Sequence, residues 1–360
     1  MNAGDEITIT PTELVAGGAA IARVDGFPIF ATNVYPGDVA VVRLLEVKKG
    51  FAHADLVRLI EASPFRRAMP CPVANECGGC DWTALRLDKQ LEAKQRILSE
   101  SLRRIGKIDP ASLPPIAIHP SPLNYRLRSR LHREGEKVGF YAMRTNDVVP
   151  LPRECEVVGV QTREHPIEGQ TWEVDGKLIA DGELTIDGYY VTTDAFFQIN
   201  RHLLGTMRTL VSNIASRAAK KNSAIDLYSG VGFFTRPLAE LFEHVTAVEG
   251  AESAHDCAKR NVPANVTLVN APVEWWVNRM PRADFVFLDP PRSGAHRNVI
   301  NAIAERTTAM VCFLACDPVT FARDASRLIA SGWRLASLDL LDLFPNTHHV
   351  ETLASFERAK

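Results

Sequence analysis

Short runs of alternating apolar and polar residues fill the first sixty positions of the chain. Between positions 6 and 60 these runs are rich in Val, Ile, Phe and Thr, and turns at 17–18, 25–26 and 36–38 separate them. A period of two is typical of half-buried strands, and regularly spaced turns are typical of small all-β domains. The pattern therefore predicts a small closed β-barrel at the amino terminus.

The hydrophobic pattern changes twice along the rest of the chain. Residues 85–105 place apolar side chains on one stripe, which predicts an amphipathic helix, and strands and turns are predicted up to about residue 190. Beyond residue 221, five apolar runs alternate with helical segments, as in a doubly wound parallel sheet. The runs at 333–345 and 349–357 have no helix between them and predict a final antiparallel pair.

Composition and charge narrow the class of protein only slightly. The 360 residues, 46% of them hydrophobic, suffice for two or three domains, and a net charge of −2 gives no overall attraction to nucleic acid. The first residues lack the basic start and apolar core of a signal peptide. No apolar run approaches the roughly 18 residues of a membrane helix. We therefore expect a cytoplasmic protein without membrane contact.

One local stretch carries the positive charge that the chain as a whole lacks. Residues 124–144 contain six Lys or Arg against two Glu, with Tyr125, His132, Phe140 and Tyr141 between them. A solvated strand face is the simpler interpretation of such a run. A neighbouring active site would favour an RNA-binding surface instead.

A candidate cofactor site begins in the segment 226–235, where a strand leads through a glycine turn into a helix. Such a turn lets the backbone approach a ligand at the carboxyl edge of a sheet. Thr235 replaces the third glycine of the dinucleotide fingerprint, which disfavours a nicotinamide cofactor. Glu249 ends the next strand, where a carboxylate binds both ribose hydroxyls, although a helix N-terminal acid is the alternative interpretation. This combination predicts a nucleoside cofactor without a pyrophosphate, namely S-adenosylmethionine.

Two further strand ends carry reactive groups at the same edge. Two prolines follow Asp289 and stiff loops of this kind position reacting groups, while Arg292 stands where amine-methylating enzymes carry an aromatic residue. Cys316 ends the fifth strand and is the candidate nucleophile. A helix starting at about Pro318 is expected to lower the pKa of this thiol.

A thiol at this edge suits methylation of carbon 5 of uracil. Addition of a thiolate to carbon 6 makes carbon 5 nucleophilic, and a base must then remove the proton from carbon 5. His348, His349 and Glu351 lie in the last hairpin, and we expect Glu351 to be the base because a tuned carboxylate can do this work. Cys257 and Cys312 are expected to be buried small hydrophobes.

Five motifs occur in the order seen in RNA uridine-5-methyltransferases, and the chain resembles this family over nearly its whole length. The motifs are FFQIN at 196–200, DLYSGVG at 226–232, LDPPR at 288–292, ACDP at 315–318 and HVET at 349–352. The resemblance implies that Cys316 is the nucleophile and Glu351 the base, with cofactor contacts from Gln198, Tyr228, Glu249 and Asp289. It also implies that residues 5–60 form a TRAM barrel, an RNA-binding module.

A cysteine cluster stands apart from the methyltransferase motifs. Cys71, Cys77 and Cys80 lie within ten residues, and Cys155 can supply a fourth thiol from the β-rich segment that follows. Four thiolates suit either a tetrahedral zinc ion or a 4Fe-4S cluster, and the spacing leaves both open. Resemblance to the family implies the iron-sulfur cluster, in a structural or RNA-orienting role.

These features together predict a multidomain protein. We expect an OB-like TRAM β-barrel over 1–62, a central β-rich domain with the cysteine cluster over 63–190, and a Rossmann-like class I α/β methyltransferase domain over 191–360. The helix at 85–105 is expected to pack on the catalytic domain.

The resemblance also bears on the substrate. Family members with both a barrel and a cysteine cluster resemble the 23S ribosomal RNA enzymes, so 23S rRNA is expected, with tRNA as the alternative. The target uridine must lie in a loop or leave its stack, and Phe196 is a candidate stacking partner. A non-catalytic RNA-binding protein and a nicotinamide-dependent oxidoreductase are the rival classes. No obligate protein partner is inferred.

Overall fold

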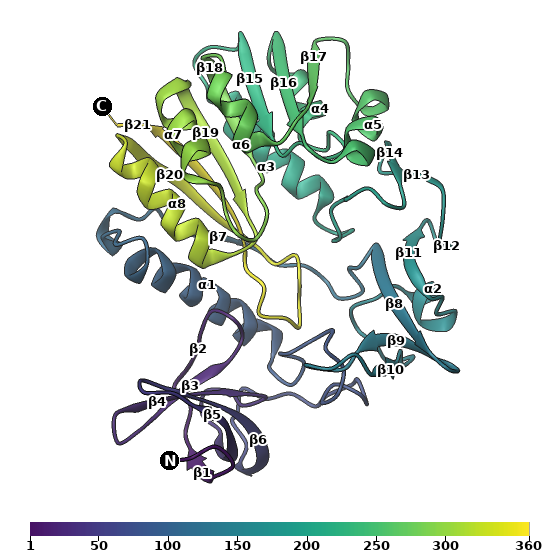
Figure 1. Ribbon diagram of the computed structural model, residues 1–360, viewed down its shortest axis with the longest axis vertical. Coiled ribbons are helices and arrows are strands. Elements are labelled where there is room, and N and C mark those ends of the chain that lie inside the picture. Colours follow the sequence, from purple (N-terminus) through teal and green to yellow (C-terminus); the bar gives the residue numbers. More distant parts are fainter. Residues whose placement is uncertain (360) are drawn as a thin grey trace.

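The computed structural model describes residues 1–359, which form four sheets with helices around the largest one, and one long helix lies between the amino-terminal sheet and the largest sheet (Figure 1). The amino-terminal sheet lies at one end of the molecule and the largest sheet at the other. In the part of the chain that the structure describes, no helix is long and apolar enough to cross a membrane.

The first six strands form one bent sheet. They are β1 (Glu6–Ile9), β2 (Glu13–Leu14), β3 (Ala20–Val24), β4 (Phe27–Thr32), β5 (Val39–Val47) and β6 (Ala52–Glu61), in the spatial order β1-β5-β6-β4-β3-β2. Register shifts between β5 and β6 bend both strands, since an extra residue on one strand of a pair increases its local twist. With β1 in contact with β3, the sheet curls into the predicted barrel shape.

A second, antiparallel sheet lies between the barrel and the largest sheet. It consists of β10 (Val148–Pro150), β9 (Lys137–Tyr141), β8 (Arg128–Glu134), β11 (Gly169–Val174) and β12 (Lys177–Ile179), in that order, with α2 (Val160–Glu164) beside it. The basic stretch of the sequence therefore becomes the β8–β9 hairpin. A separate hairpin follows, formed by β13 (Glu183–Ile186) and β14 (Tyr189–Thr192), and it packs on helix α5 (Glu252–Asn261) beside the largest sheet.

The largest sheet has eight strands, and five neighbouring parallel strands within it confirm the predicted α/β pattern. The spatial order of all eight is β17 (Val266–Asn270), β16 (His244–Glu249), β15 (Ser223–Leu227), β18 (Ala283–Leu288), β19 (Thr307–Ala315), β21 (Glu351–Arg358), β20 (Trp333–Leu341) and β7 (Ile116–His119). Strands β15 to β19 are parallel, while β21 runs antiparallel between β19 and β20 as predicted for the terminal pair.

Helices cover both faces of this sheet, which explains why its central strands are mostly apolar. Along β18, Val286 and Leu288 face one core while Phe285 and Phe287 face the other. The helices and 3-10 turns are α3 (Leu204–Ser216), α4 (Thr235–Ala239), α5 (Glu252–Asn261), α6 (Val273–Trp276), η2 (Val277–Arg279), α7 (Arg297–Arg306) and α8 (Pro318–Ala330), with η1 (Pro110–Ser112) before β7.

Two segments from earlier in the chain join the largest sheet. Strand β7 pairs in parallel with β20 as the sheet's edge, a strand that the proline-rich sequence around it did not predict. Helix α1 (Leu87–Arg104) lies along α8, and its Ile97, Leu98 and Leu102 enter the same core as Phe321 and Leu328. That core continues into the barrel, so burial of apolar surface joins the amino-terminal sheet to the largest one.

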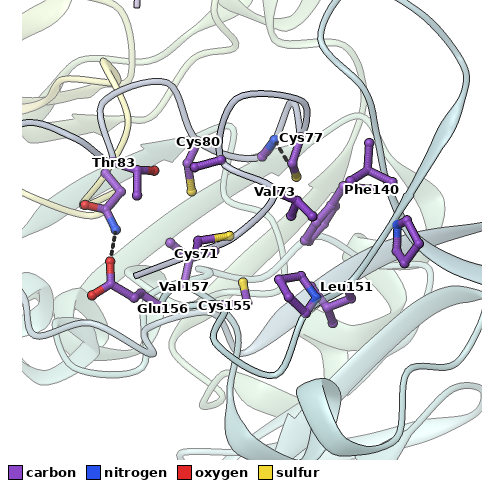
Figure 2. Close-up of a pocket in the computed structure, with 16 residues that line it drawn as sticks. Cys71, Val73, Cys77, Cys80, Thr83, Phe140, Leu151, Cys155, Glu156 and Val157 are labelled. Carbon is purple, nitrogen blue, oxygen red and sulfur yellow. Dashed lines mark hydrogen bonds between the residues drawn. The ribbon is translucent and has the colours of Figure 1, made fainter. Parts of the chain in front are cut away.

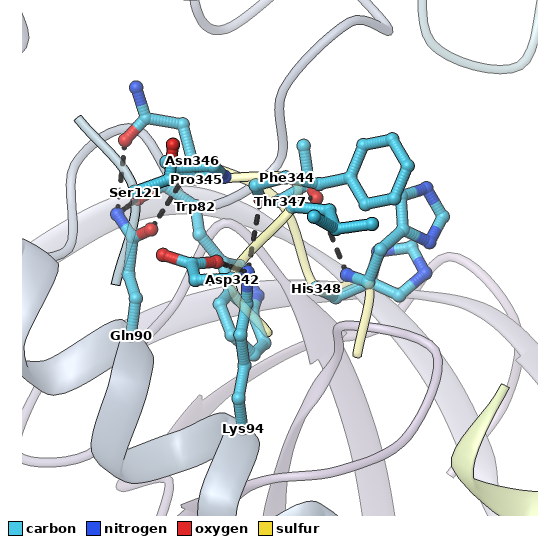
Figure 3. Close-up of polar contacts among 12 residues, drawn as sticks. Trp82, Gln90, Lys94, Ser121, Asp342, Phe344, Pro345, Asn346, Thr347 and His348 are labelled. Carbon is cyan, nitrogen blue, oxygen red and sulfur yellow. Dashed lines mark hydrogen bonds and ion pairs between the residues drawn. The ribbon is translucent and has the colours of Figure 1, made fainter. Parts of the chain in front are cut away.

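Helix α1 also holds the loop that connects β20 to β21. Residues 342–350 form neither helix nor strand, yet two buried side chains of α1 contact them (Figure 3). The Lys94 Nζ lies 2.6 Å from Asp342 Oδ1 and donates a hydrogen bond of 3.0 Å to the Phe344 carbonyl. Gln90 donates to the Asn346 side chain at 3.1 Å and accepts from the Asn346 backbone N–H at 2.8 Å. These contacts fix the path of the chain that enters β21.

We expect Lys94→Met to lower the free energy of unfolding by about 3–5 kcal/mol, because the Asp342 carboxylate would stay buried without its cation. Urea unfolding followed by tryptophan fluorescence measures the change.

The matched control is Lys89→Met on the same helix, whose ammonium pairs with Glu92 at the surface; the expected change is less than about 1 kcal/mol. Replacing both members, Lys94→Met with Asp342→Leu, should recover part of the loss because no charge remains buried. An unchanged stability for Lys94→Met alone would show that the buried pair does not hold the loop.

Candidate active site

The strand order brings the predicted nucleophile and base side by side. Parallel strands β18 and β19 end at the same edge of the sheet, so Asp289 and Cys316 follow them into one region. Strand β21 runs antiparallel to β19, with Thr352 opposite Ala315, so the first residue of β21, Glu351, starts beside Cys316. Gln198 reaches the same place from the loop after β14 and donates to Asp289 Oδ2 at 3.4 Å.

Both carboxyl groups at this edge are protonated more readily than carboxyl groups in water. Burial raises the pKa of Glu351 well above its ordinary value, and the nearby Asp289 raises it further while Arg292 lowers it. Burial likewise raises the pKa of Asp289 to about 7, although the hydrogen bond from Gln198 opposes the shift. Asp289 can therefore take up or release a proton near neutral pH, and Glu351 binds its proton more tightly than a carboxyl group in water does.

The expected low pKa of Cys316 was wrong. Burial raises the pKa of this thiol to about 12, the charges of Glu351 and Asp289 add to the shift, and Arg292 opposes it. Helix α8 does begin at Pro318, but its first free N–H groups are capped by Asp317, whose Oδ1 accepts from Val319 and Thr320. The helix terminus therefore gives Cys316 little stabilisation as a thiolate.

The two histidines before Glu351 are placed differently from it. His348 Nδ1 lies 2.5 Å from Asp81 Oδ2, and its backbone N–H donates to the same carboxylate. Burial, followed by the neighbouring His348 and Arg292, lowers the pKa of His349 to about 3. An imidazole with so low a pKa is a weak base at neutral pH, so Glu351 is the stronger candidate base.

The glycine turn after β15 lies at the same edge as these groups. Tyr228 and Gly230 adopt positive φ, of 62° and 55°, which turns the chain sharply out of the strand. The Glu249 carboxylate accepts from the backbone N–H groups of Gly230 at 2.8 Å and Ala251 at 2.7 Å. The Tyr228 hydroxyl donates to Glu274 at 2.7 Å, and burial together with this contact raises its pKa. Glu249 therefore stabilises the glycine turn by hydrogen bonding and also lies near the start of α5.

Asp226 was not singled out from the sequence, although it opens the glycine-turn motif. It is fully buried in β15, and one carboxylate oxygen accepts from the Thr235 hydroxyl at 2.5 Å. Its other oxygen has no hydrogen-bond partner among residues 1–359. Burial raises its pKa to about 8, and the charges of Asp289 and Glu249 contribute to the rise. The signal that could have identified it is its position as an acid at the end of an otherwise apolar strand.

The four cysteines of the predicted cluster line one pocket on the other side of the 342–350 loop. Figure 2 shows their sulfurs facing a shared space, three from the loop 71–80 and one from Cys155. The walls are mostly apolar and include Val73, Phe140 and Leu151, and the Gly79 N–H donates to Cys77 Sγ at 3.4 Å. Across residues 1–359, no three or more His, Cys, Asp or Glu side chains converge tightly enough to hold one metal ion. The thiols instead surround the pocket.

The α/β sheet, with its glycine turn, its strand-end acids and the cysteine beside Glu351, defines a methyltransferase fold with a barrel attached to it. Comparison with protein families agrees. Residues 157–272 and 280–359 match the tRNA (uracil-5-)-methyltransferase family, and residues 2–57 match the TRAM domain. The chain belongs to this uracil-5-methyltransferase family, as its motifs predicted.

Similar proteins span the whole chain. An uncharacterised RNA methyltransferase of Corynebacterium efficiens is 31% identical and aligns with 99% of this chain and 95% of its own. An uncharacterised RNA methyltransferase of Gloeobacter violaceus is 28% identical, and the alignment covers 99% of this chain and 97% of that protein. Among solved structures, the Pyrococcus abyssi tRNA (uracil-54, C5)-methyltransferase in complex with S-adenosyl-L-homocysteine has a TM-score of 0.73 at 21% identity, with 97% of this chain and 100% of that chain covered. The latter similarity shows a shared fold.

In the free protein, we expect the alkylation of Cys316 by iodoacetamide to accelerate about tenfold per pH unit between about pH 7 and about pH 10, because the thiol titrates near 12. Peptide mass spectrometry isolates the rate at Cys316 from that of the other thiols. Glu351→Gln should speed the reaction, most clearly at the alkaline end, where Glu351 carries its charge. A plateau below about pH 9 would contradict the raised pKa.

Proposed function

We propose that this protein transfers a methyl group from S-adenosylmethionine to carbon 5 of a uridine in RNA. The observation that carries the proposal is the adjacency of Cys316, at the end of β19, and Glu351, at the start of β21. A nucleophile and a proton acceptor are both needed for this reaction, and both lie at the sheet edge where α/β folds bind ligands. Membership of the uracil-5-methyltransferase family supports the same chemistry.

The two residues act in sequence in the proposed mechanism. Cys316 loses its proton to water, and its thiolate adds to carbon 6 of the uracil, which makes carbon 5 nucleophilic. S-adenosylmethionine supplies the activated methyl group that carbon 5 receives. Glu351 then removes the proton from carbon 5, and elimination restores the double bond and releases Cys316. The raised pKa of Glu351 matches this step, because a carboxylate with an ordinary pKa is a weak base.

Four residues are proposed to bind the cofactor. Glu249 would contact the ribose, while Tyr228, Gln198 and Asp289 line the same edge of the sheet. The Gln198–Asp289 hydrogen bond supports a shared site, since it joins the loop after β14 to the end of β18. Asp226 lies behind them, where its charge interacts with those of Asp289 and Glu249.

We propose 23S rRNA as the substrate, since the barrel and cysteine cluster together resemble the ribosomal enzymes of the family. A tRNA is the second candidate, because the similar structure from Pyrococcus abyssi belongs to a tRNA enzyme. Phe196, two residues before Gln198, is 58% exposed and has the Arg128 guanidinium 5.9 Å from its ring centroid. It is the proposed stacking partner of the target uracil.

The proposed domains are the TRAM barrel over 1–62, the central domain over 63–190 and the methyltransferase domain over 191–360. Strand β7, helix α1 and the hairpin β13–β14 belong to the central domain by sequence but pack on the methyltransferase domain. We therefore treat these three segments as elements that cover the methyltransferase domain.

We propose that Cys71, Cys77, Cys80 and Cys155 hold a 4Fe-4S cluster. Four thiols around one pocket fit a cluster in which each thiolate binds a different iron atom, and the apolar walls would shield it from water. The Gly79 N–H that donates to Cys77 Sγ is the kind of contact that stabilises a thiolate ligand. Its proposed role is structural, because the cysteine pocket and the Cys316–Glu351 pair are separate.

Incubation of the anaerobically purified protein with methyl-labelled S-adenosylmethionine and unmodified 23S rRNA or tRNA tests the function. Nucleoside analysis should find the label in 5-methyluridine of 23S rRNA. Cys316→Ala should lower the methylation rate at least about 10⁴-fold, since no other thiol replaces the nucleophile. Cys312→Ala, in the strand that ends just before Cys316, is the matched control that keeps the nucleophile. Label in tRNA alone would show that tRNA, and not 23S rRNA, is the substrate. Label in a nucleoside other than 5-methyluridine would contradict the proposed chemistry.

The cluster has a test that does not depend on activity. Iron and acid-labile sulfide analysis of anaerobic protein should give about four of each per chain for a 4Fe-4S cluster. Cys155→Ser should lose most of both, whereas Cys257→Ser, at a buried cysteine far along the chain, should keep them. Zinc in place of iron would support the alternative that the spacing left open.

A further inference from the structure

A large groove lies beside the candidate active site, and its walls come from four separate parts of the chain. The barrel contributes residues 17–18 and 32–33, the cysteine loop 78–81, and the β8–β9 hairpin His132 and residues 140–144. Thr347 and His349 close one end. The groove holds about 610 Å³ of open space, which lies within the usual range for ligand pockets.

Two aromatic rings in this groove are stacked on each other and project from the hairpin. The rings of His132 and Tyr141 lie parallel, with centroids 3.7 Å apart and an interplanar angle of 12°. They come from neighbouring strands, where His132 pairs with Gly139 and Tyr141 is its diagonal neighbour. Tyr141 is 38% exposed, so the stack keeps aromatic surface free. Every nucleobase can stack on such a surface.

Positive charge flanks the aromatic pair. The Arg126 guanidinium lies 5.2 Å from the Phe140 ring centroid, and its Nε has no hydrogen-bond partner within residues 1–359. Arg144 lies at the barrel side, where its guanidinium donates to Asp55 Oδ1 at 2.9 Å. The single carboxylate among the lining residues, Asp81, is already paired with His348. Arg144 is already paired with Asp55, so Arg126 is the lining cation best placed to meet an anionic group of a ligand.

Glycines make the remaining walls shallow. Gly17, Gly18, Gly78 and Gly79 all line the groove, and a side chain added at Gly17 would meet no other atom within 4 Å. At Gly17 the missing side chain therefore lets a sugar–phosphate backbone come close to the protein, whereas Gly18, Gly78 and Gly79 pack against neighbouring residues. An aromatic platform, flanking cations and an open backbone surface are the elements of a site for single-stranded nucleic acid.

The groove is also within reach of the reacting residues. His349 lines it and precedes Glu351 by two residues, about 7 Å along an extended chain. On its other side, His349 lies 3.2 Å from the Arg292 guanidinium, which faces Cys316 and Glu351. A nucleotide in the groove would therefore be a close neighbour of the uridine at Cys316.

We infer that this groove binds an unpaired nucleotide next to the target uridine, with its base stacked on the Tyr141–His132 pair and its phosphate beside Arg126. The inference rests on the proposed function and adds a requirement to it: at least one flanking nucleotide must be single-stranded. A duplexed base cannot offer its face to the tyrosine.

A combination of protein and RNA substitutions tests the inference. Binding is measured in the presence of S-adenosylhomocysteine, with the RNA fragment that accepts label and with copies in which each flanking nucleotide in turn is abasic. One abasic position should weaken wild-type binding by about 5- to 150-fold, the range for loss of one stacked base. Tyr141→Ala should weaken binding similarly and should abolish the effect of that abasic position. Tyr141→Phe, which keeps the ring, should behave as wild type.

Equal binding by Tyr141→Ala and wild type, or the same abasic effect in both, would overturn the inference. A thermal shift with S-adenosylhomocysteine confirms that each variant is folded. If wild-type protein labels no RNA, the proposed function fails. Binding of a short oligouridine strand to wild type and to the two Tyr141 variants then still decides whether the aromatic pair binds an unpaired base.

Discussion

The buried ion pair between Lys94 and Asp342 is the contact on which the geometry of the reacting residues depends. Residues 342–350 have no regular structure, yet they must deliver Glu351 to the side of Cys316. The backbone N–H and C=O groups of a loop lack the hydrogen bonds that pair strands in a sheet, so they need other partners. Helix α1 supplies them through Lys94 and Gln90 (Figure 3). Because a buried ion pair contributes little net stability, its value here is the fixed position of the loop.

The same loop joins the other parts of the protein to the reaction centre. Asp81, which follows Cys80 of the proposed cluster site, accepts from the backbone N–H of His348. Trp82 donates its indole N–H to Gly18 in the barrel at 3.0 Å and packs in the core shared with α1. The residues directly after the cysteines thus contact the barrel through Trp82 and the 342–350 loop through Asp81. A cluster that orders residues 71–80 would in this way also order the start of β21.

The sequence predicted the parts of the site that depend on local pattern. Apolar runs followed by acids or a thiol identified Asp289 and Cys316, because strand ends in an α/β sheet share one edge. The last hairpin also offered Glu351 as the expected base, and the antiparallel strand β21, inserted between β19 and β20, brings it beside Cys316. The TRAM barrel and the family itself were confirmed by comparison.

What the sequence could not predict depends on contacts between distant residues. Strand β7 is four residues long and flanked by prolines, so only its pairing with β20 identifies it. The pKa of Cys316 was predicted to fall because a helix follows it, but burial and two neighbouring carboxyls outweigh that helix. The groove is likewise invisible in the sequence, since its walls come from segments more than 300 residues apart, from Gly17 to His349.

The central claim is that Cys316 and Glu351 act in turn on one uridine. Its most direct test is peptide mass spectrometry of Glu351→Gln after incubation with S-adenosylmethionine and the RNA that wild-type protein methylates. The account expects a methylated uridine nucleotide joined to the Cys316 peptide, because the proton on carbon 5 stays in place and the thiol cannot leave. An adduct on a different cysteine, or wild-type rates of 5-methyluridine release with no adduct, would contradict it.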